Sequence, residues 1–131
     1  MKLKHILLAG IMTASFANAD DVMKQSMAAM QNGMTQVQQG FLNNDVKSIR
    51  EGIKLIKEGN AKFSDKKVIK QYLPADKKHM INVAENQARR IALDATVLEL
   101  NLDDKAYVNA SNAYADIMNA CSRCHAIVRS W

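Results

Sequence analysis

Apolar residues recur along this sequence with alternating steps of three and four positions, in four separate stretches. Such spacing places one face of a helix against its neighbours. No stretch alternates β-branched and polar residues with period two, so the pattern predicts helices and no strands. The four stripes are Met23, Met27, Met30, Met34, Val37, Phe41; Val46, Ile49, Ile53, Ile56; Ile81, Ala84, Ala88, Ile91, Ala95, Leu98; and Tyr107, Ala110, Tyr114, Ile117, Cys121, Cys124, Val128.

Residues that cap or end helices lie between these stripes. Residues 61–75 form the one longer link, and the other connections are short. Short connections make neighbouring helices run antiparallel. The pattern therefore predicts an all-α protein, an antiparallel up-down-up-down four-helix bundle. The expected boundaries, in chain order, are Asn43-Asn44-Asp45, Gly59-Asn60, Asp76 after Pro74, and Asp103 or Asp104.

The first residues of the chain have the pattern of an export signal. Lys2 and Lys4 supply the positive start, the run 6–16 is apolar, and Ala17-Asn18-Ala19 offers small residues to a signal peptidase. An apolar run of this length is shorter than the roughly 20 residues that a membrane-spanning helix needs. The sequence thus predicts a cleaved signal peptide over residues 1–19 and one exported, periplasmic domain over residues 20–131. No stable membrane insertion is expected.

The charge of the chain is mildly basic. Removing residues 1–19 takes away Lys2 and Lys4, which lowers the formal net charge from +5 to +3. The basic residues are spread along the chain, whereas a nucleic-acid-binding domain would gather them on one face. We therefore expect no nucleic acid among its partners.

Near the end of the fourth predicted helix stands the run Cys121-Ser122-Arg123-Cys124-His125. Cys-x-x-Cys-His is the attachment signature of c-type haem. Each thiol adds across one haem vinyl group, and the histidine reaches the iron from the same side. On a helix these three residues share the apolar face. The motif predicts one covalent haem c in the bundle core near the C-terminus, bound through Cys121, Cys124 and His125, with His125 as an iron ligand.

Other interpretations of the two cysteines fit less well. A dithiol redox site would normally begin a helix beside a strand. A structural zinc site needs four ligands, and only the distant His79 could join the three residues of the motif. A haem-free helical binding protein remains the alternative from a different class of function.

With these features the chain resembles the class II c-type cytochromes, the group of cytochrome c′ and its low-spin relatives. The resemblance covers the chain after residue 19 in helix number, length and motif position. The family motif continues to an arginine four residues after the histidine, where Arg129 stands. Lys24-Gln25-Ser26-Met27 is similar to the region of the family's first helix that approaches the distal side of the haem. In the second and third helices the similarity is of pattern only.

The resemblance implies two kinds of iron site, one with an open sixth position and one closed by a methionine of the first helix. In an antiparallel bundle the start of the first helix lies beside the end of the last, so Met27 and His125 should lie at similar heights. At 1.5 Å per residue, Met23 lies about 6 Å nearer the rim and Met30 about 4.5 Å deeper. Met27 is therefore the expected second iron ligand, and the other methionines are interpreted as core. His79 is the weaker alternative.

By the same resemblance, Lys24 approaches a haem propionate and Arg129 covers the proximal side. The favoured function is a mono-haem single-electron carrier with His/Met ligation and redox proteins as partners. The alternative is a five-coordinate cytochrome c′ that binds nitric oxide or carbon monoxide. No distal histidine–arginine pair supports an enzyme. The family resemblance also allows a homodimer through the first two helices.

Overall fold

The computed structural model describes residues 19–129, and this part of the chain is all-helical, without strands. The prediction of an all-α protein is confirmed. The predicted signal peptide lies almost entirely outside the described residues. None of the described helices is long and apolar enough to cross a membrane. The elements are α1 (Ala19–Asn43), α2 (Val46–Phe63), α3 (Lys66–Tyr72), a 3-10 helix η1 (Ala75–Met80), α4 (Ile81–Asp103) and α5 (Tyr107–Val128).

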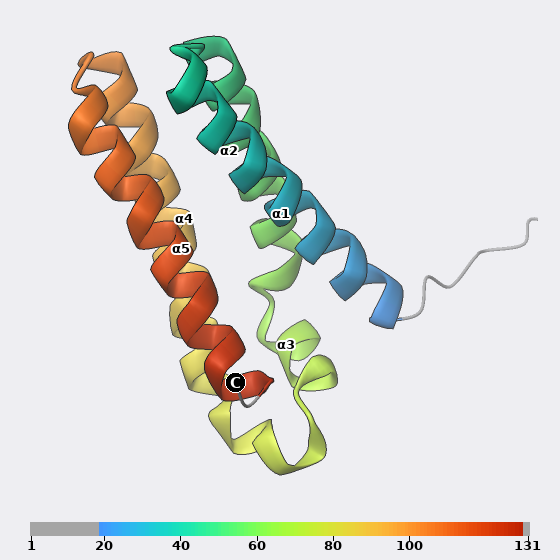
Figure 1. The fold of residues 1–131 in the computed structure, drawn as a ribbon. Coiled ribbons are helices and arrows are strands. Elements are labelled where there is room, and N and C mark those ends of the chain that lie inside the picture. Colours follow the sequence, from blue (N-terminus) through green and yellow to red (C-terminus); the bar gives the residue numbers. More distant parts are fainter. Residues whose placement is uncertain (1–18, 130–131) are drawn as a thin grey trace, which may run out of the picture.

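The long helices form two hairpins, α1 with α2 and α4 with α5, which is compatible with the expected helical bundle (Figure 1). The first reversal uses Asn44 in the left-handed region, with φ of 55°, a conformation that asparagine adopts more readily than most residues. Asp45 then caps α2, because its side chain accepts a hydrogen bond from the backbone N–H of Ser48 at 3.0 Å. This boundary was predicted from the sequence and is confirmed.

Three other predicted boundaries are wrong. Helix α2 continues through Gly59-Asn60 to Phe63, because Gly59 serves helix packing rather than termination. Asp76 lies in the first turn of η1, and α4 begins only at Ile81. Asp103 ends α4 and Asp104 is its C-cap, so neither caps α5. The chain reverses after them, at Lys105 with φ of 57°.

The predicted link between the second and third long helices contains a helix of its own, α3. Asp65 caps α3 by accepting a hydrogen bond from the backbone N–H of Lys67 at 2.7 Å. Ile69 and Leu73 are buried and pack in a small core with Phe63 of α2 and Ala84 of α4. Helix α3 therefore closes the end of the molecule where α5 finishes.

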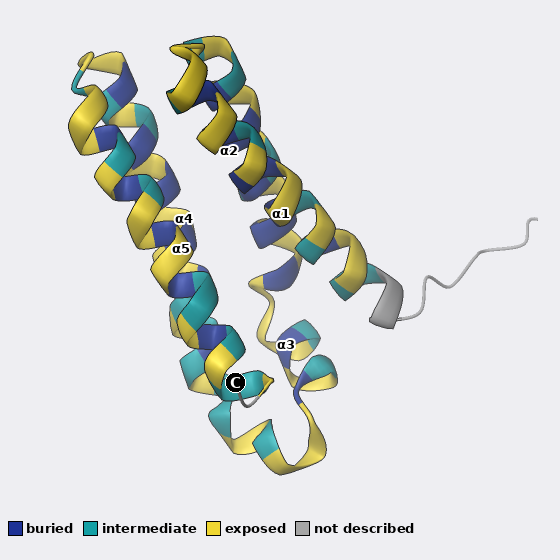
Figure 2. Ribbon diagram, viewed as in Figure 1, coloured by how far each residue is buried: buried dark blue, intermediate teal, exposed yellow. Residues whose placement is uncertain are grey.

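Buried positions recur along the inner side of each long helix (Figure 2). A larger core occupies the turn end of both hairpins, where Ile53, Leu98 and Ile117 are fully enclosed. A smaller core lies at the opposite end and includes Cys124, with Met27 packed against it. The cysteine motif thus lies at the end of the molecule where the core is smaller and helix α3 is added.

Polar contacts join α2 to α4 across the two hairpins. The Asn60 side-chain amide donates a hydrogen bond to the carbonyl oxygen of Ala88 at 2.9 Å, and Asn60 is buried. Arg50 bonds Asp103 at 2.7 Å, and Lys57 forms an ion pair with Glu99. Because buried polar groups are costly without partners, the Asn60 bond helps to fix how the hairpins align.

Helices α1 and α2 approach unusually closely, because glycines face each other where they meet. A Cβ atom at Gly33 would lie 2.6 Å from the carbonyl oxygen of Gly52, and one at Gly52 would lie 2.7 Å from that of Gly33. Further along the same contact, a Cβ at Gly59 would lie 2.7 Å from the carbonyl oxygen of Ser26. Any side chain at these positions would push the two helices apart.

We expect Gly33→Ala to destabilise the protein, although alanine is the better helix former. Helix propensity alone would stabilise an interior Gly→Ala change by about 1 kcal/mol. The close approach to α2 backbone opposes this, and overpacking of this kind costs about 1–3 kcal/mol. Urea unfolding followed by circular dichroism measures the difference, and the exposed Ala28→Gly change in the same helix calibrates the propensity. A more stable Gly33→Ala protein would contradict the packing.

Candidate functional site

Helix α5 carries all three residues of the cysteine–histidine motif and turns them toward one cavity. Cys124 is buried, while Cys121 and His125 are half-buried. Both thiols are free rather than joined in a disulfide. All three side chains line a cavity of about 360 Å³ between α1, α4 and α5. The helical spacing that predicted a shared face for the motif is therefore seen in the structure.

The cavity wall opposite the motif comes from α1 and has an apolar and a polar part. Met27, Met30 and Met34 line it together with Phe63 of α2 and Ile91 of α4. The exposed side chains of Gln31, Thr35 and Gln38 also line it. A mainly apolar lining with a few polar groups is typical of ligand sites. The cavity therefore suits a large apolar ligand that the α5 motif could hold at one edge.

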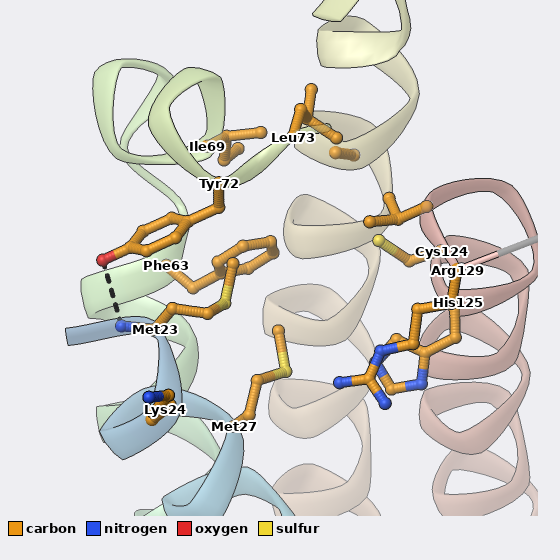
Figure 3. Close-up of a pocket in the computed structure, with 12 residues that line it drawn as sticks. Met23, Lys24, Met27, Phe63, Ile69, Tyr72, Leu73, Cys124, His125 and Arg129 are labelled. Carbon is orange, nitrogen blue, oxygen red and sulfur yellow. Dashed lines mark hydrogen bonds between the residues drawn. The ribbon is translucent and has the colours of Figure 1, made fainter. Parts of the chain in front are cut away.

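A second cavity of about 250 Å³ adjoins the first toward the end of the molecule. It is lined by Met23 and Lys24 of α1 and by Ile69, Tyr72 and Leu73 around α3 (Figure 3). The two cavities have five lining residues in common, so they meet beside the motif. The shared residues are Met27, Phe63, Cys124, His125 and Arg129.

The four methionines of α1 have different surroundings. Met30 and Met34 are buried, and Met30 packs against α2 at Gly59. Met23 lines only the cavity toward the end of the molecule. Met27 lines both cavities, and its side chain extends from α1 toward the α5 wall that carries Cys124 and His125 (Figure 3). Met27 and His125, which the sequence placed at similar heights, thus line the same two cavities.

Burial controls the protonation of the motif. It lowers the pKa of His125, and the nearby Arg129 cation lowers it further. It also raises the pKa of the Cys124 thiol, an effect that Arg129 partly opposes. The pKa of Cys121 is raised by burial first and by Cys124 second. At neutral pH the imidazole is therefore neutral, as a metal ligand must be, and the thiols are protonated.

Two basic side chains border the cavities. Arg129 is the C-cap residue of α5, donates its backbone N–H to the carbonyl oxygen of His125 at 2.8 Å, and lies beside that imidazole (Figure 3). Lys24 is exposed at the mouth of the smaller cavity. The two residues that the family resemblance implied, Lys24 and Arg129, therefore both line a cavity that the motif also lines. His79, by contrast, is exposed in η1 and lines neither of these two cavities.

Tyr72 is a residue of this region that sequence reasoning missed. Its hydroxyl accepts a hydrogen bond from the backbone N–H of Met23 at 3.0 Å, which ties α3 to the start of α1 (Figure 3). The signal for it was weak, because the apolar positions Ile69, Tyr72 and Leu73 are only a single helical turn long. Tyr72 fixes the α1 backbone one turn before Met27.

Comparisons with protein-family models, with curated proteins and with solved structures give no match to this chain. Among residues 19–129, no three histidine, cysteine, aspartate or glutamate side chains gather in a way that could hold a metal ion. The motif and the cavity are therefore the features that bear on the function of the chain.

Proposed function

We propose that this chain is an exported, periplasmic mono-haem c-type cytochrome of the class II kind, a four-helix bundle that carries single electrons. The observation that supports this proposal is that two walls of one cavity face each other and carry the residues concerned. The α5 wall carries Cys121, Cys124 and His125, and the α1 wall carries Met27. The donor set, the apolar wall and the neutral imidazole fit a haem group in the cavity.

Attachment would join the two thiols of the motif to the two vinyl groups of haem. Each Cys S–H would add across a vinyl C=C bond, with sulfur bonding one carbon and the hydrogen going to the other. Such an addition would consume no oxidant or reductant. Cys121 and Cys124 lie one helical turn apart on the cavity face of α5. Free thiols at both positions are the form that this addition requires.

The bound haem would supply one-electron iron chemistry, taking an electron from one redox protein and passing it to another. In this assignment His125 and Met27 would hold the iron, and a histidine–methionine pair would raise the reduction potential relative to two histidines. The apolar part of the cavity lining would shield the group from water and favour its less charged reduced form. Lys24 and Arg129 lie at the cavity margin, where cations would offset the propionate charges.

A five-coordinate, gas-binding cytochrome is the second candidate. The observation that favours it is the free space on both sides of Met27, which lines the two adjoining cavities and is only half-buried. A side chain with such room, and with the flexibility of methionine, can swing away from an iron centre. Nitric oxide or carbon monoxide would then enter on the α1 side.

The test is to export the full chain from a host with haem-attachment machinery and to record its mass and absorption spectrum. We expect loss of residues 1–19, a mass increase of one haem that survives denaturation, and a low-spin spectrum. Carbon monoxide should change the ferrous spectrum little. Direct uptake of carbon monoxide by a high-spin iron would favour the gas-binding candidate. A mature chain without added mass would contradict the proposal and favour a haem-free helical binding protein.

A further inference from the structure

The outer face of α4 carries an apolar stripe that this chain leaves in contact with solvent. Leu93, Val97 and Leu100 are 59%, 38% and 57% exposed. Steps of four and three residues place them on one side of the helix. The opposite side, with Ala95 and Leu98, is fully buried in the core. The stripe is therefore not required for the packing of α4 within its own chain.

Charged residues of opposite sign flank this stripe. Arg89 and Arg90 precede it, while Asp103 and Asp104 follow it at the end of α4. The last turn of α4 carries no basic residue, so two carboxylates lie at the negative end of the helix dipole. Arg50 of α2 already supplies one cation there, at Asp103, and a further cation near Asp104 would stabilise that end more.

These residues are arranged symmetrically about a midpoint of α4, with apolar residues matching apolar residues and positive charges matching negative ones. Leu93 and Leu100 are equally far from a midpoint between Thr96 and Val97. The same midpoint relates Arg89 to Asp104, and Arg90 to Asp103. Two copies of α4 laid antiparallel across this midpoint would therefore place each arginine opposite a carboxylate and each leucine opposite a leucine.

We propose that the outer face of α4 is a dimer interface whose partner is a second copy of this chain. An antiparallel pair of α4 helices about a two-fold axis uses the same patch on both subunits, as an isologous interface requires. The apolar stripe supplies the buried centre, and the arginine–aspartate pairs at its two ends form the rim and fix the register. The inference rests on α4 alone and does not depend on haem.

The charged residues already have intramolecular partners that do not prevent this arrangement. Arg89 pairs with Glu85, and Arg90 pairs with Asp94 and Asp116. Asp103 pairs with Arg50 of α2. The guanidinium groups of Arg89 and Arg90 are exposed and can reach a second partner from solvent, although Glu85 and Asp94 are themselves largely buried. An arginine can bind a second carboxylate while it keeps the first. With one helix from each subunit, the buried area is small, so we expect a weak dimer that forms as concentration rises.

Sedimentation velocity of the purified, exported protein over a range of concentrations measures this dimer. We expect Leu93→Asp to weaken self-association by about tenfold or more, since it places a charge at the centre of the interface. Leu42→Asp, at the 77% exposed Leu42 near the end of α1, is the matched control and should leave the dimer unchanged. A wild-type protein that stays monomeric, or a dimer that Leu93→Asp leaves intact, would overturn the proposal. A dimer lost only in Leu42→Asp would overturn it too and would point to the α1–α2 face instead.

Charge reversal tests the antiparallel register separately. Arg89→Glu should weaken the dimer because it sets a carboxylate against Asp104 of the second copy, and Asp104→Arg should do the same with two guanidinium groups. Mixing the two variants restores opposite-charge pairs, so equal amounts should associate about as well as the wild-type protein. Circular dichroism checks that each variant is folded. Failure of the mixture to associate, with both variants folded, would exclude this register.

Discussion

Replacing both Cys121 and Cys124 by alanine is expected to leave the exported protein without covalently bound haem. Each thiol supplies one thioether bond in the proposed attachment, and alanine has no group that adds to a vinyl carbon. Alanine is chosen rather than serine because Cys124 lies in the smaller core, where serine would bury an unpaired hydroxyl. Intact mass after denaturation should therefore fall from that of chain plus haem to that of the chain alone.

Ser122→Ala is the matched control, because Ser122 lies in the same turn of α5 and also lines the larger cavity. It should keep the full haem mass. The single variants Cys121→Ala and Cys124→Ala should each keep no more than one thioether. The vinyl group that stays unreacted in them should shift the absorption spectrum of the reduced protein. Haem mass that persists in the double variant after denaturation would refute attachment through this motif.

The long helices and their inner faces were predictable because hydrophobic spacing reports directly on burial. Asp45 was predictable as a cap because its short acidic side chain can accept a hydrogen bond from the first turn of the helix that follows. The same pattern was misleading at Asp76 and Asp103, because a 3-10 helix and a turn separate these residues from the helices they were expected to cap. Gly59 was misinterpreted as a helix end because glycine both ends helices and admits close neighbours. The close approach of Gly59 to Ser26 of α1 decides between these roles, and this contact joins residues that are far apart in the sequence.

The candidate site was predictable where its residues are close in sequence, and much less so where they are not. Cys121, Cys124 and His125 share a face by helical geometry alone. The approach of Met27 to them depended on an antiparallel arrangement and an estimate of height, and the structure does bring it to the same cavity. Helix α3 and Tyr72 were missed, because a single turn of apolar residues gives almost no periodic signal.

Met27→Leu is expected to convert the iron from a low-spin to a high-spin state and to lower the reduction potential. Leucine has nearly the volume of methionine, so the stability should change by less than about 1.5 kcal/mol. Only the thioether sulfur is lost, and with it the proposed second iron ligand. The potential should fall by on the order of 0.1 V, since axial ligands set much of it. Absorption spectra and redox titration of the exported protein measure both effects, and the ferrous variant should now take up carbon monoxide.

Met23→Leu and Met30→Leu separate ligation from packing, because they make the same chemical change in the same helix. Met30 is buried against α2 and Met23 lines the outer cavity, so neither substitution should alter the spin state. A spectral change in Met23→Leu rather than Met27→Leu would move the ligand one turn toward the start of α1. If all three variants keep the wild-type spectrum, none of these three methionines binds the iron. The sixth position of the iron would then be open or closed by another group. An open position would favour the gas-binding cytochrome, with the two cavities that meet beside His125 as the space for the gas.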